Sequence, residues 1–350
     1  MTKLSILSRV KHHLKLGNFI FGVPAKWDKS EGKMISISES KEKIVKAFTD
    51  LNILFIIARI WTMLTKEASL LERIVGNTLT SLAVVDFLLG YNPSDHAHMQ
   101  FVNCIFSSED IEPGKQWATV LTVLGFFFDV IEVGYYVIGA SHAMHSNDTF
   151  PMSTWTAQLN PLLVRGEFLI FLQLSVCTAY YLLTVLLTGV TFLWIEIETF
   201  IKRCKTEIFD QAEYRKVQVF EKLLNSCIRE SIFLKVALLV PAFQVIILYV
   251  TIKMSHAHQY FLTMAFLYVY LGSIGFTVLT FSAAGKVYAA SQDWIAKSKT
   301  GERKKYGRKF HYSLIPLRLQ FGRNFVEPLT PLVVQEFCIR QTISFLLVTN

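Results

Sequence analysis

Charged residues are scarce in this chain, and their scarcity excludes an ordinary soluble protein. Of its 350 residues, 18% are charged and 52% are hydrophobic, and the mean hydropathy is +0.39. Soluble globular proteins carry about 25% charged residues and lack long uncharged apolar runs. The composition therefore predicts an all-α membrane protein that crosses the bilayer several times.

Cysteine is also scarce, and several familiar motifs are missing. No cleavable signal peptide is visible, because the first long apolar run starts near residue 47, after a polar and basic stretch. No glycine-rich phosphate loop and no nucleophile motif is present. The five cysteines fall in expected cytoplasmic loops or inside expected spans, which predicts that all stay reduced and unpaired: Cys104, Cys204, Cys227, Cys177 and Cys338.

Long apolar runs are abundant. A membrane-spanning helix needs about 20 mostly apolar residues, and seven segments meet this condition. They form a transmembrane domain over 47–350, preceded by a cytoplasmic segment 1–46. The predicted spans are 47–64, 70–91, 117–140, 167–195, 233–252, 259–285 and 325–350.

Positive charge in the loops predicts the orientation. Segments 1–46, 196–231 and 286–324 hold ten, seven and ten Lys and Arg residues and Lys115 lies on the same side, whereas the alternate loops, counted with Arg73 at the start of span two, hold only four. Cytoplasmic loops are the basic ones. The N-terminus is therefore expected in the cytoplasm and, after seven spans, the C-terminus outside the cell. The sequon at Asn147 agrees, because it falls in a loop that this topology exposes for glycosylation.

The cytoplasmic segments contain further helical patterns. Leu4, Leu7, Val10 and Leu14 recur at helical spacing among basic residues, which predicts either a helix on the membrane surface or a disordered basic arm. The stretch from Pro24 to Gly32 reads as a turn. Apolar residues also recur at helical spacing after span four. Helical extensions of the spans are therefore expected over 196–232 and 286–324.

Other protein classes remain as alternatives. A G-protein-coupled receptor has its N-terminus outside, and this chain lacks an Asp-Arg-Tyr-type triplet after span three and an Asn-Pro-x-x-Tyr run in span seven. A membrane transporter would show internal repeats and broken helices, and none is visible. A metal-dependent membrane enzyme needs converging histidines. The histidine pairs fall on both sides of the membrane, although an incidental outer metal site stays open: His142, His145, His256 and His258.

Together these features resemble the insect-type chemoreceptors, the odorant and gustatory receptors of arthropods. The resemblance lies in seven spans, a cytoplasmic N-terminus, long helices after span four and a very short tail. Gustatory members end in Thr-Tyr, five apolar residues and Gln. Here Thr342-Ile343 is followed by Ser344 to Val348 and then Thr349-Asn350, so Ile343 replaces the Tyr and Thr349 the Gln.

The resemblance implies a chemosensory receptor of the plasma membrane that is a ligand-gated cation channel and not an enzyme. Four identical or related subunits would surround a pore lined by the seventh span, with no cofactor and no nucleic-acid partner. Polar residues near the middle of that span suit this role, because polar rings permit hydrated ions and apolar rings gate by dewetting. The predicted pore-lining residues are Val334, Glu336, Cys338, Gln341, Thr342, Phe345 and Thr349.

The resemblance also implies a small-molecule site in the outer half of the membrane, among spans two, three, four and six. Aromatic side chains with a few polar anchors are typical of such sites. The expected ligand-binding residues are Glu132, Tyr135, Tyr136, Phe168, Phe171, Gln173, Tyr260, Met264 and Tyr268, with Tyr270 beside them. Asp86, near the cytoplasmic end of span two, is expected at the membrane interface.

Overall fold

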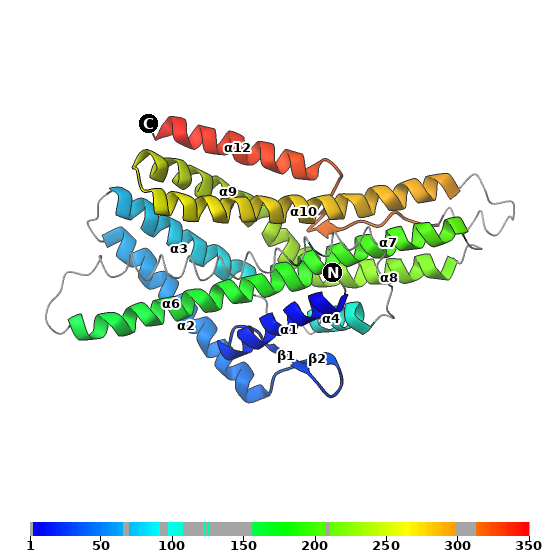
Figure 1. Cartoon of the computed structure of the whole chain (residues 1–350), viewed down its shortest axis with the longest axis horizontal. Helices are drawn as coiled ribbons and strands as arrows, with labels where there is room; N and C mark the ends of the chain where they lie inside the picture. The colour runs from blue at the N-terminus through cyan, green and yellow to red at the C-terminus, as the bar shows by residue number, and fades with distance from the viewer. Residues whose placement is uncertain are drawn as a thin grey trace.

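The structure, a computed structural model, describes residues 3–65, 70–91, 97–107, 156–206, 211–298 and 313–349, with the single residues 122 and 125. The described parts form an elongated bundle of helices with two small β-hairpins (Figure 1). The bounds, in chain order, are α1 Lys3–Phe19, β1 Ala25–Asp28, β2 Lys33–Ser36, α2 Glu39–Thr65, α3 Leu70–Gly90, α4 Ala97–Ser107, α6 Thr156–Ala179, the π-helix η1 Tyr180–Leu187, α7 Thr188–Thr206, α8 Gln211–Cys227, the π-helix η2 Ile228–Ile232, α9 Phe233–His256, α10 Tyr260–Ser298, β3 Gln320–Phe321, β4 Asn324–Phe325 and α12 Thr330–Val348.

The N-terminal residues 3–36 form a packed unit. Helix α1 forms, which is the helical one of the two alternatives that the sequence left open. Its apolar face is covered by protein, because Ile6, Val10 and Leu14 are at most 1% exposed and α1 packs against β1, α6 and η1. This burial corrects the expectation that the face lies on the membrane or belongs to a disordered arm. The predicted turn is the tip of the hairpin β1–β2, where Gly32 adopts a left-handed conformation with φ of +64°.

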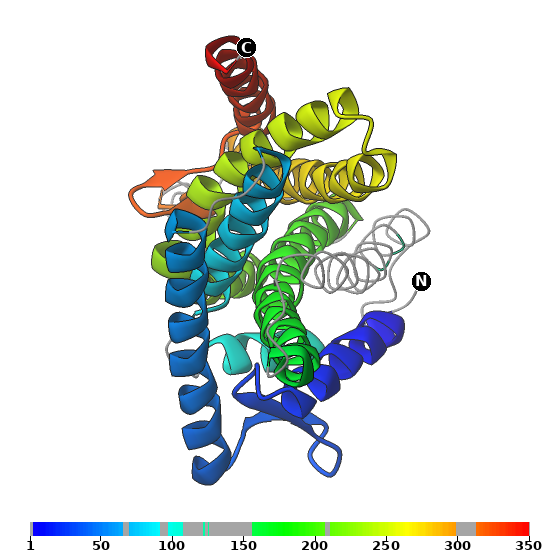
Figure 2. The ribbon, with the colours of Figure 1, turned by 90° about the vertical axis from the view of Figure 1, so that its left-hand side faces the viewer.

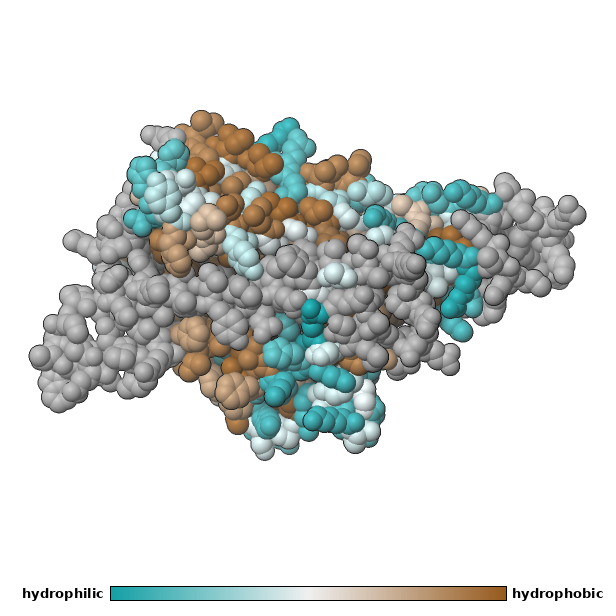
Figure 3. Space-filling model, viewed as in Figure 1, coloured by the Kyte–Doolittle hydropathy of each residue, from teal (hydrophilic) through white to brown (hydrophobic). Residues whose placement is uncertain are grey.

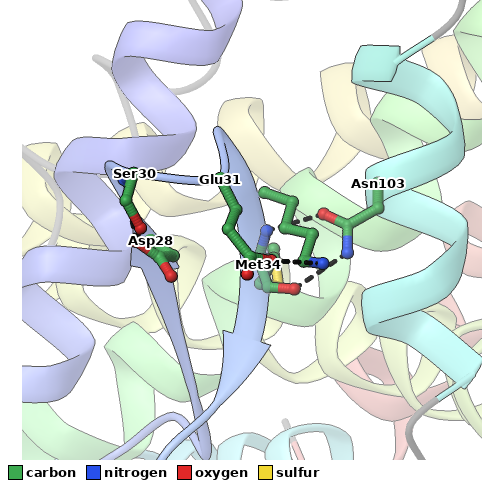
Figure 4. Close-up of polar contacts among 6 residues, drawn as sticks. Asp28, Ser30, Glu31, Met34 and Asn103 are labelled. Atoms are coloured by element: carbon green, nitrogen blue, oxygen red, sulfur yellow. Dashed lines mark hydrogen bonds and ion pairs between the residues drawn. The ribbon is translucent and has the colours of Figure 1, made fainter.

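A side-chain clamp fastens this hairpin to α4. The amide of Asn103 on α4 accepts from the backbone N–H of Met34 at 2.6 Å and donates to the carbonyl of Met34 at 2.8 Å. Figure 4 shows this amide facing strand β2, with Asp28, Ser30 and Glu31 at the hairpin turn. Helix α4 was not predicted. With 11 residues it is too short for a span, although Ala97, Phe101 and Ile105 follow helical spacing.

One half of the bundle has the character of a membrane domain. Six helices of the described residues are long and apolar enough to cross a bilayer, and they correspond to predicted spans one, two, four, five, six and seven. The third predicted span, 117–140, lies almost wholly outside the described residues. These findings establish a multi-pass membrane protein, and the orientation stays a prediction.

Two of the helices are much longer than one bilayer crossing. The apolar helices over Phe168–Cys204 and Tyr260–Lys297 have 37 and 38 residues, against about 20 for a crossing. Helix α6 continues through η1 into α7, so the run predicted as span four is longer than one span. The second halves of these helices pack with α8 into the largest core, where Phe200, Tyr214 and Trp294 form an aromatic cluster.

Residues 313–329, called the strap here, lead from this core to α12. Helical extension was predicted over 286–324, and α10 does continue to Ser298, but the strap is extended chain with the hairpin β3–β4. Proline 316 lacks a backbone N–H, and Gly322 has a φ of +57° at the hairpin turn. Both features oppose a helix.

Side chains of α8 and η2 hold the strap in place. Tyr214 Oη donates to the carbonyl of Ile315 at 2.9 Å. Arg229 Nε donates to the carbonyl of Gly322 at 2.8 Å. Asn225 donates to the carbonyl of Arg318 at 2.8 Å and accepts from the N–H of Gln320 at 3.1 Å. The strap is therefore fixed by hydrogen bonds between these side chains and its backbone, and does not depend on helix formation.

The two ends of the bundle differ in the hydropathy of their surfaces. Hydrophobic side chains cover the face over α12 and α9, whereas the opposite end, where α7, α8 and the end of α10 lie, is largely hydrophilic (Figure 3). Seen end-on, α12 stands at one edge of the bundle (Figure 2). It contacts α9 and α10, and most of its circumference is exposed.

Candidate pore helix and ligand cavity

Helix α12 has one face bound to the protein. Its buried residues are Pro331, Cys338 and Thr342. The buried side chain of Gln244 on α9 joins three helices: it donates to Thr277 Oγ1 on α10 at 2.8 Å, and its Oε1 accepts from Gln335 Nε2 and Cys338 Sγ at 3.3 Å each. This polar junction positions the helix.

The opposite face of α12 is exposed. Val333, Ile343 and Leu347 are 61%, 51% and 75% exposed. Glu336 and Arg340 lie on the same face and form an ion pair at 2.5 Å, with exposed side chains. A lone helix facing lipid would place this ion pair in hydrocarbon at high cost. The face therefore favours water or another protein subunit over lipid.

The residues predicted to line the pore do not all lie on one face of α12. Cys338 and Thr342 are 1% and 2% exposed and point to α9, which corrects their assignment to the pore. Val334 packs partly against the main core, and the ring of Phe345 lies 6.3 Å from that of Tyr249. Helical periodicity reveals which residues share a face, but two opposite stripes of α12 are both partly polar, so the pattern alone does not select one.

The remaining predicted pore residues are at least partly accessible. Glu336 and Gln341 are exposed, and Glu336 lies on the face opposite Cys338. Thr349 ends the helix, where its carbonyl accepts a hydrogen bond from Lys253 Nζ at 3.3 Å.

The predicted ligand residues do not form one described site. Glu132, Tyr135 and Tyr136 lie outside the described residues, as does Asn147. Phe171 on α6 is buried at 2% exposure and belongs to the core of α3, α6 and α9, and Phe168 on the same helix is half-buried. On α10, Tyr260 and Met264 are 70% and 64% exposed; Tyr268 and Tyr270 are half-buried.

Gln173 lies elsewhere than expected. Its Nε2 donates to the carbonyl of Phe21, between α1 and β1, at 3.0 Å. This contact draws Gln173 to the N-terminal unit, near the ends of α3 and α2 that the predicted topology places on the cytoplasmic side. The sequence of predicted span four did not indicate this contact. Its apolar residues look alike, although half of them pack in the protein core outside the membrane domain.

A cavity of about 510 Å³ opens at that position. We call it the α2–α6 cavity. It is lined by Phe21, Gly22, Pro24, Glu42, Val45, Lys46, Thr49, Asp50, Asn52, Ile53, Asp86, Phe87, Gly90, Tyr91, Gln173, Leu174, Cys177 and Tyr181. Its volume falls in the range of small-molecule sites, about 300–1,000 Å³.

Asp86, which was expected at the membrane interface, is part of this cavity and is buried in the protein. Its side chain is 8% exposed, and its Oδ2 accepts from Ser175 Oγ at 2.8 Å. Thr178 Oγ1 donates to the Asp86 backbone carbonyl at 2.6 Å. Sequence reasoning missed both this burial and the position of Asn52 at the cavity. A lone amide in the apolar run LNILFII was the available signal, because such residues in a span normally face protein or water.

Metal ligands do not gather in the described part of the chain. No group of three or more His, Cys, Asp or Glu residues there is placed to hold a metal ion. His142 and His145 lie outside the described residues, and His256 and His258 are exposed beside the loop between α9 and α10. All five cysteines are free thiols, as predicted.

The architecture defines a class of protein before any comparison: a multi-pass helical membrane protein whose long helices continue into a protein-packed bundle. Solved structures of insect olfactory receptors have this fold. The insect olfactory receptor OR5 from Machilis hrabei in complex with eugenol matches with a TM-score of 0.65 over 98% of both chains, at 12% identity. The same receptor in a second structure matches with a TM-score of 0.64 at 12% identity, over 98% of this chain and 97% of that one.

The comparison confirms the insect chemoreceptor-type fold expected from the resemblance, whereas the count of seven spans and the orientation stay predictions. At 12% identity the likeness is one of fold. No protein-family model matches the chain, and no curated protein sequence does.

Proposed function

We propose that this protein is a subunit of a chemosensory receptor, of the odorant or gustatory type, that acts as a ligand-gated cation channel in the plasma membrane. The observation that carries the proposal is the exposed face of α12, which holds the Glu336–Arg340 ion pair among apolar side chains, in a chain with an olfactory receptor fold. Four subunits, identical or related, would bring four copies of this face together around a central pore. The proposal makes the protein a channel and not an enzyme.

Pore lining then follows the exposed face of α12. Val333, Ile343 and Leu347 supply apolar rings, which gate by dewetting. Glu336 and Arg340 supply rings of opposite charge between them. Gln341, Phe345 and Thr349 are exposed positions outside this face and remain further candidates. The C-terminal end of the helix would stand at the outer mouth of the pore.

The ligand of such a receptor is a small molecule. One of the similar olfactory receptor structures holds eugenol, which makes an aromatic, weakly polar compound a reasonable first probe. Phe168, Phe171, Tyr260, Met264, Tyr268, Glu132, Tyr135 and Tyr136 remain the candidates for its site. The cell would admit cations when such a ligand binds.

Whole-cell recording tests this function directly. Cells expressing the full chain, alone and with a related subunit, would receive eugenol and a panel of volatile and soluble compounds. A ligand-dependent cation current supports the proposal. Stoichiometric uptake of the ligand without a channel-like conductance would favour a transporter, and a response that requires G proteins would favour a G-protein-coupled receptor.

Opposing charge changes on α12 test the pore face. We expect Glu336→Gln to reduce the preference for cations, because it leaves the Arg340 ring unopposed, and Arg340→Gln to increase it. The measurement is the reversal potential of the ligand-gated current in asymmetric NaCl. The control is Thr342→Val on the buried face, which should leave the reversal potential unchanged. Identical reversal potentials in all three variants would contradict this pore face.

A further inference from the structure

The α2–α6 cavity contains two buried amide oxygens that accept no hydrogen bond. Asn52 and Gln173 both line the cavity and are each 5% exposed. Neither Asn52 Oδ1 nor Gln173 Oε1 has a hydrogen-bond partner. A buried acceptor without a donor costs free energy. An occupant of the cavity that carries N–H groups would supply the donors that these two acceptors lack.

The charges around the cavity favour a positive occupant. Lys46 is paired with Glu42 at 3.0 Å across one helical turn of α2, which leaves the carboxylates of Asp50 and Asp86. Neither forms an ion pair with any described residue. Asp86 is the deeper of the two, and Asp50 is exposed at the rim. A buried carboxylate is stabilised by an opposite charge or by hydrogen-bond donors.

Aromatic rings line the rest of the space. Phe21 stands on the side of the N-terminal unit, and Tyr181 stands on the side of η1. Phe87 and Tyr91 stack with their ring centroids 5.5 Å apart at the end of α3. Aromatic faces attract cations and also accommodate apolar groups. The cavity thus combines unpartnered acceptors, negative charge and aromatic surface.

We propose that the α2–α6 cavity binds a small organic ammonium ion with an apolar body, with Asp86 as its counterion and Asn52 and Gln173 as acceptors of its N–H groups. This site is separate from the candidate ligand residues on α10 and from the pore face, so it goes beyond the proposed function. It lies beside the contact between Gln173 and the Phe21 carbonyl. An occupant would therefore bear on the junction between the N-terminal unit and α6.

Equilibrium binding to the purified full-length protein in detergent tests the site without any current measurement. The probe is phenethylamine, a primary ammonium ion at neutral pH. Its neutral counterpart 2-phenylethanol and the anion 3-phenylpropanoate serve as ligand controls. We expect saturable binding of the amine and weaker binding of both controls. Equal binding of amine and alcohol, or no binding of the amine, would overturn the proposal.

Two variants locate the binding. Asp86→Asn keeps the size of the side chain and removes its charge, and should weaken amine binding about tenfold or more, as expected for a charge-assisted hydrogen bond. Asn52→Leu removes an unpartnered amide, so it should leave the fold intact and still weaken amine binding severalfold. Asp293→Asn, on an exposed part of α10, is the matched control. Unchanged affinity in Asn52→Leu and Asp86→Asn would refute the site even if one of them folds poorly.

The ammonium group has two possible sources, a free amine or the headgroup of an ethanolamine lipid. Adding phosphatidylethanolamine to the binding assay distinguishes them. Displacement of phenethylamine by this lipid, and not by phosphatidylglycerol, identifies the headgroup as the occupant. Binding that neither lipid disturbs identifies a free amine. A protein that binds phenethylamine but carries no current would retain this site while losing the proposed channel function.

Discussion

Single side chains decide how α12 is attached. Gln244 is completely buried and contacts Thr277, Gln335 and Cys338. An amide is suited to this position because it donates and accepts at once. Its location in the apolar run of span five gave a hint of function, but the partners come from helices that are distant in sequence.

Replacing Gln244 by an apolar residue tests its role in attaching α12. Gln244→Leu should lower the free energy of unfolding by about 1–3 kcal/mol, because it leaves polar groups on α10 and α12 without their buried partner. The measurement is thermal unfolding of the purified protein, followed by tryptophan fluorescence. Gln341→Leu, at an exposed position of α12, is the control. Equal melting temperatures for both variants would contradict the role of Gln244.

A second residue, Glu221 on α8, makes the strap sensitive to pH. Its Oε1 accepts from Asn225 Nδ2 at 2.7 Å and from the N–H of Arg318 at 3.4 Å. Burial is the main cause that raises the pKa of this carboxyl above its ordinary value, and the two hydrogen bonds oppose the shift in part. The Glu221 carboxyl group therefore binds its proton more tightly in the folded protein than in the unfolded chain.

The direction of the pH effect follows from linkage. Because the folded-state pKa is the higher one, Glu221 reduces stability as pH rises from the unfolded pKa through the folded one, and the deficit persists above it. Glu221→Gln keeps both hydrogen bonds and loses this titration. We expect its melting temperature, relative to wild type, to rise between about pH 4.5 and neutral pH. Glu213→Gln on the same helix is the control, and parallel pH profiles for Glu221→Gln and wild type would refute the effect.

At the scale of elements, the strap is the connection between the packed bundle and α12. It passes α10 at Gly285, where an added Cβ would lie 2.9 Å from Cα of Pro328 and 3.1 Å from the Glu327 carbonyl oxygen. Backbone atoms cannot move away as a flexible side chain can. Only glycine allows this close approach.

Gly285→Ala should therefore displace the strap. We expect a loss of about 1–3 kcal/mol in stability, as for overpacked sites, and altered opening of the ligand-gated current because the strap leads directly into α12. The control is Gly272→Ala on the same helix, where an added Cβ meets nothing within 4 Å. Wild-type melting and gating in Gly285→Ala would show that the strap tolerates displacement.

Elements also show what the sequence could predict. Six of the predicted spans correspond to helices in the structure. A long apolar run in a chain this poor in charge is typical of a membrane-spanning helix. Their ends were less predictable, since burial in protein and burial in lipid select the same residues. The run from Tyr180 to Leu187 is buried inside the protein and not by lipid. The strap was missed because tertiary hydrogen bonds, and not local periodicity, hold it, and α4 was missed because its 11 residues are too few for a span.

The sites were less predictable than the fold for a similar reason. The stripe containing Cys338 and the stripe containing Glu336 both carry polar residues, and only the position of α9 separates them. The α2–α6 cavity joins Phe21, Asn52, Asp86 and Gln173, which come from four separate segments. No pattern within one segment could have predicted that these four residues lie around one cavity.

At the scale of the whole molecule, the orientation in the membrane is the prediction to test. The basic loops place the N-terminus in the cytoplasm and the C-terminus outside. An epitope tag after Asn350 should stain intact cells, whereas a tag before Met1 should stain only permeabilised cells. A tag at either end that leaves the ligand-gated current unchanged serves as the control for folding. Staining of the N-terminal tag on intact cells would overturn this topology and favour the alternative that the protein is a G-protein-coupled receptor.

The length of α10 has a mechanical consequence. Its 39 residues make a rod of about 58 Å at 1.5 Å per residue, and the strap presses on it at Gly285, about two thirds of the way along. If the helix pivoted at this point, it would act as a lever with unequal arms. A tilt of about 5° would move its Tyr260 end by about 3 Å and its Ser298 end by under about 2 Å in the opposite direction. Small rearrangements at the Ser298 end would thus reach the Tyr260 end of the helix enlarged, without any helix having to break.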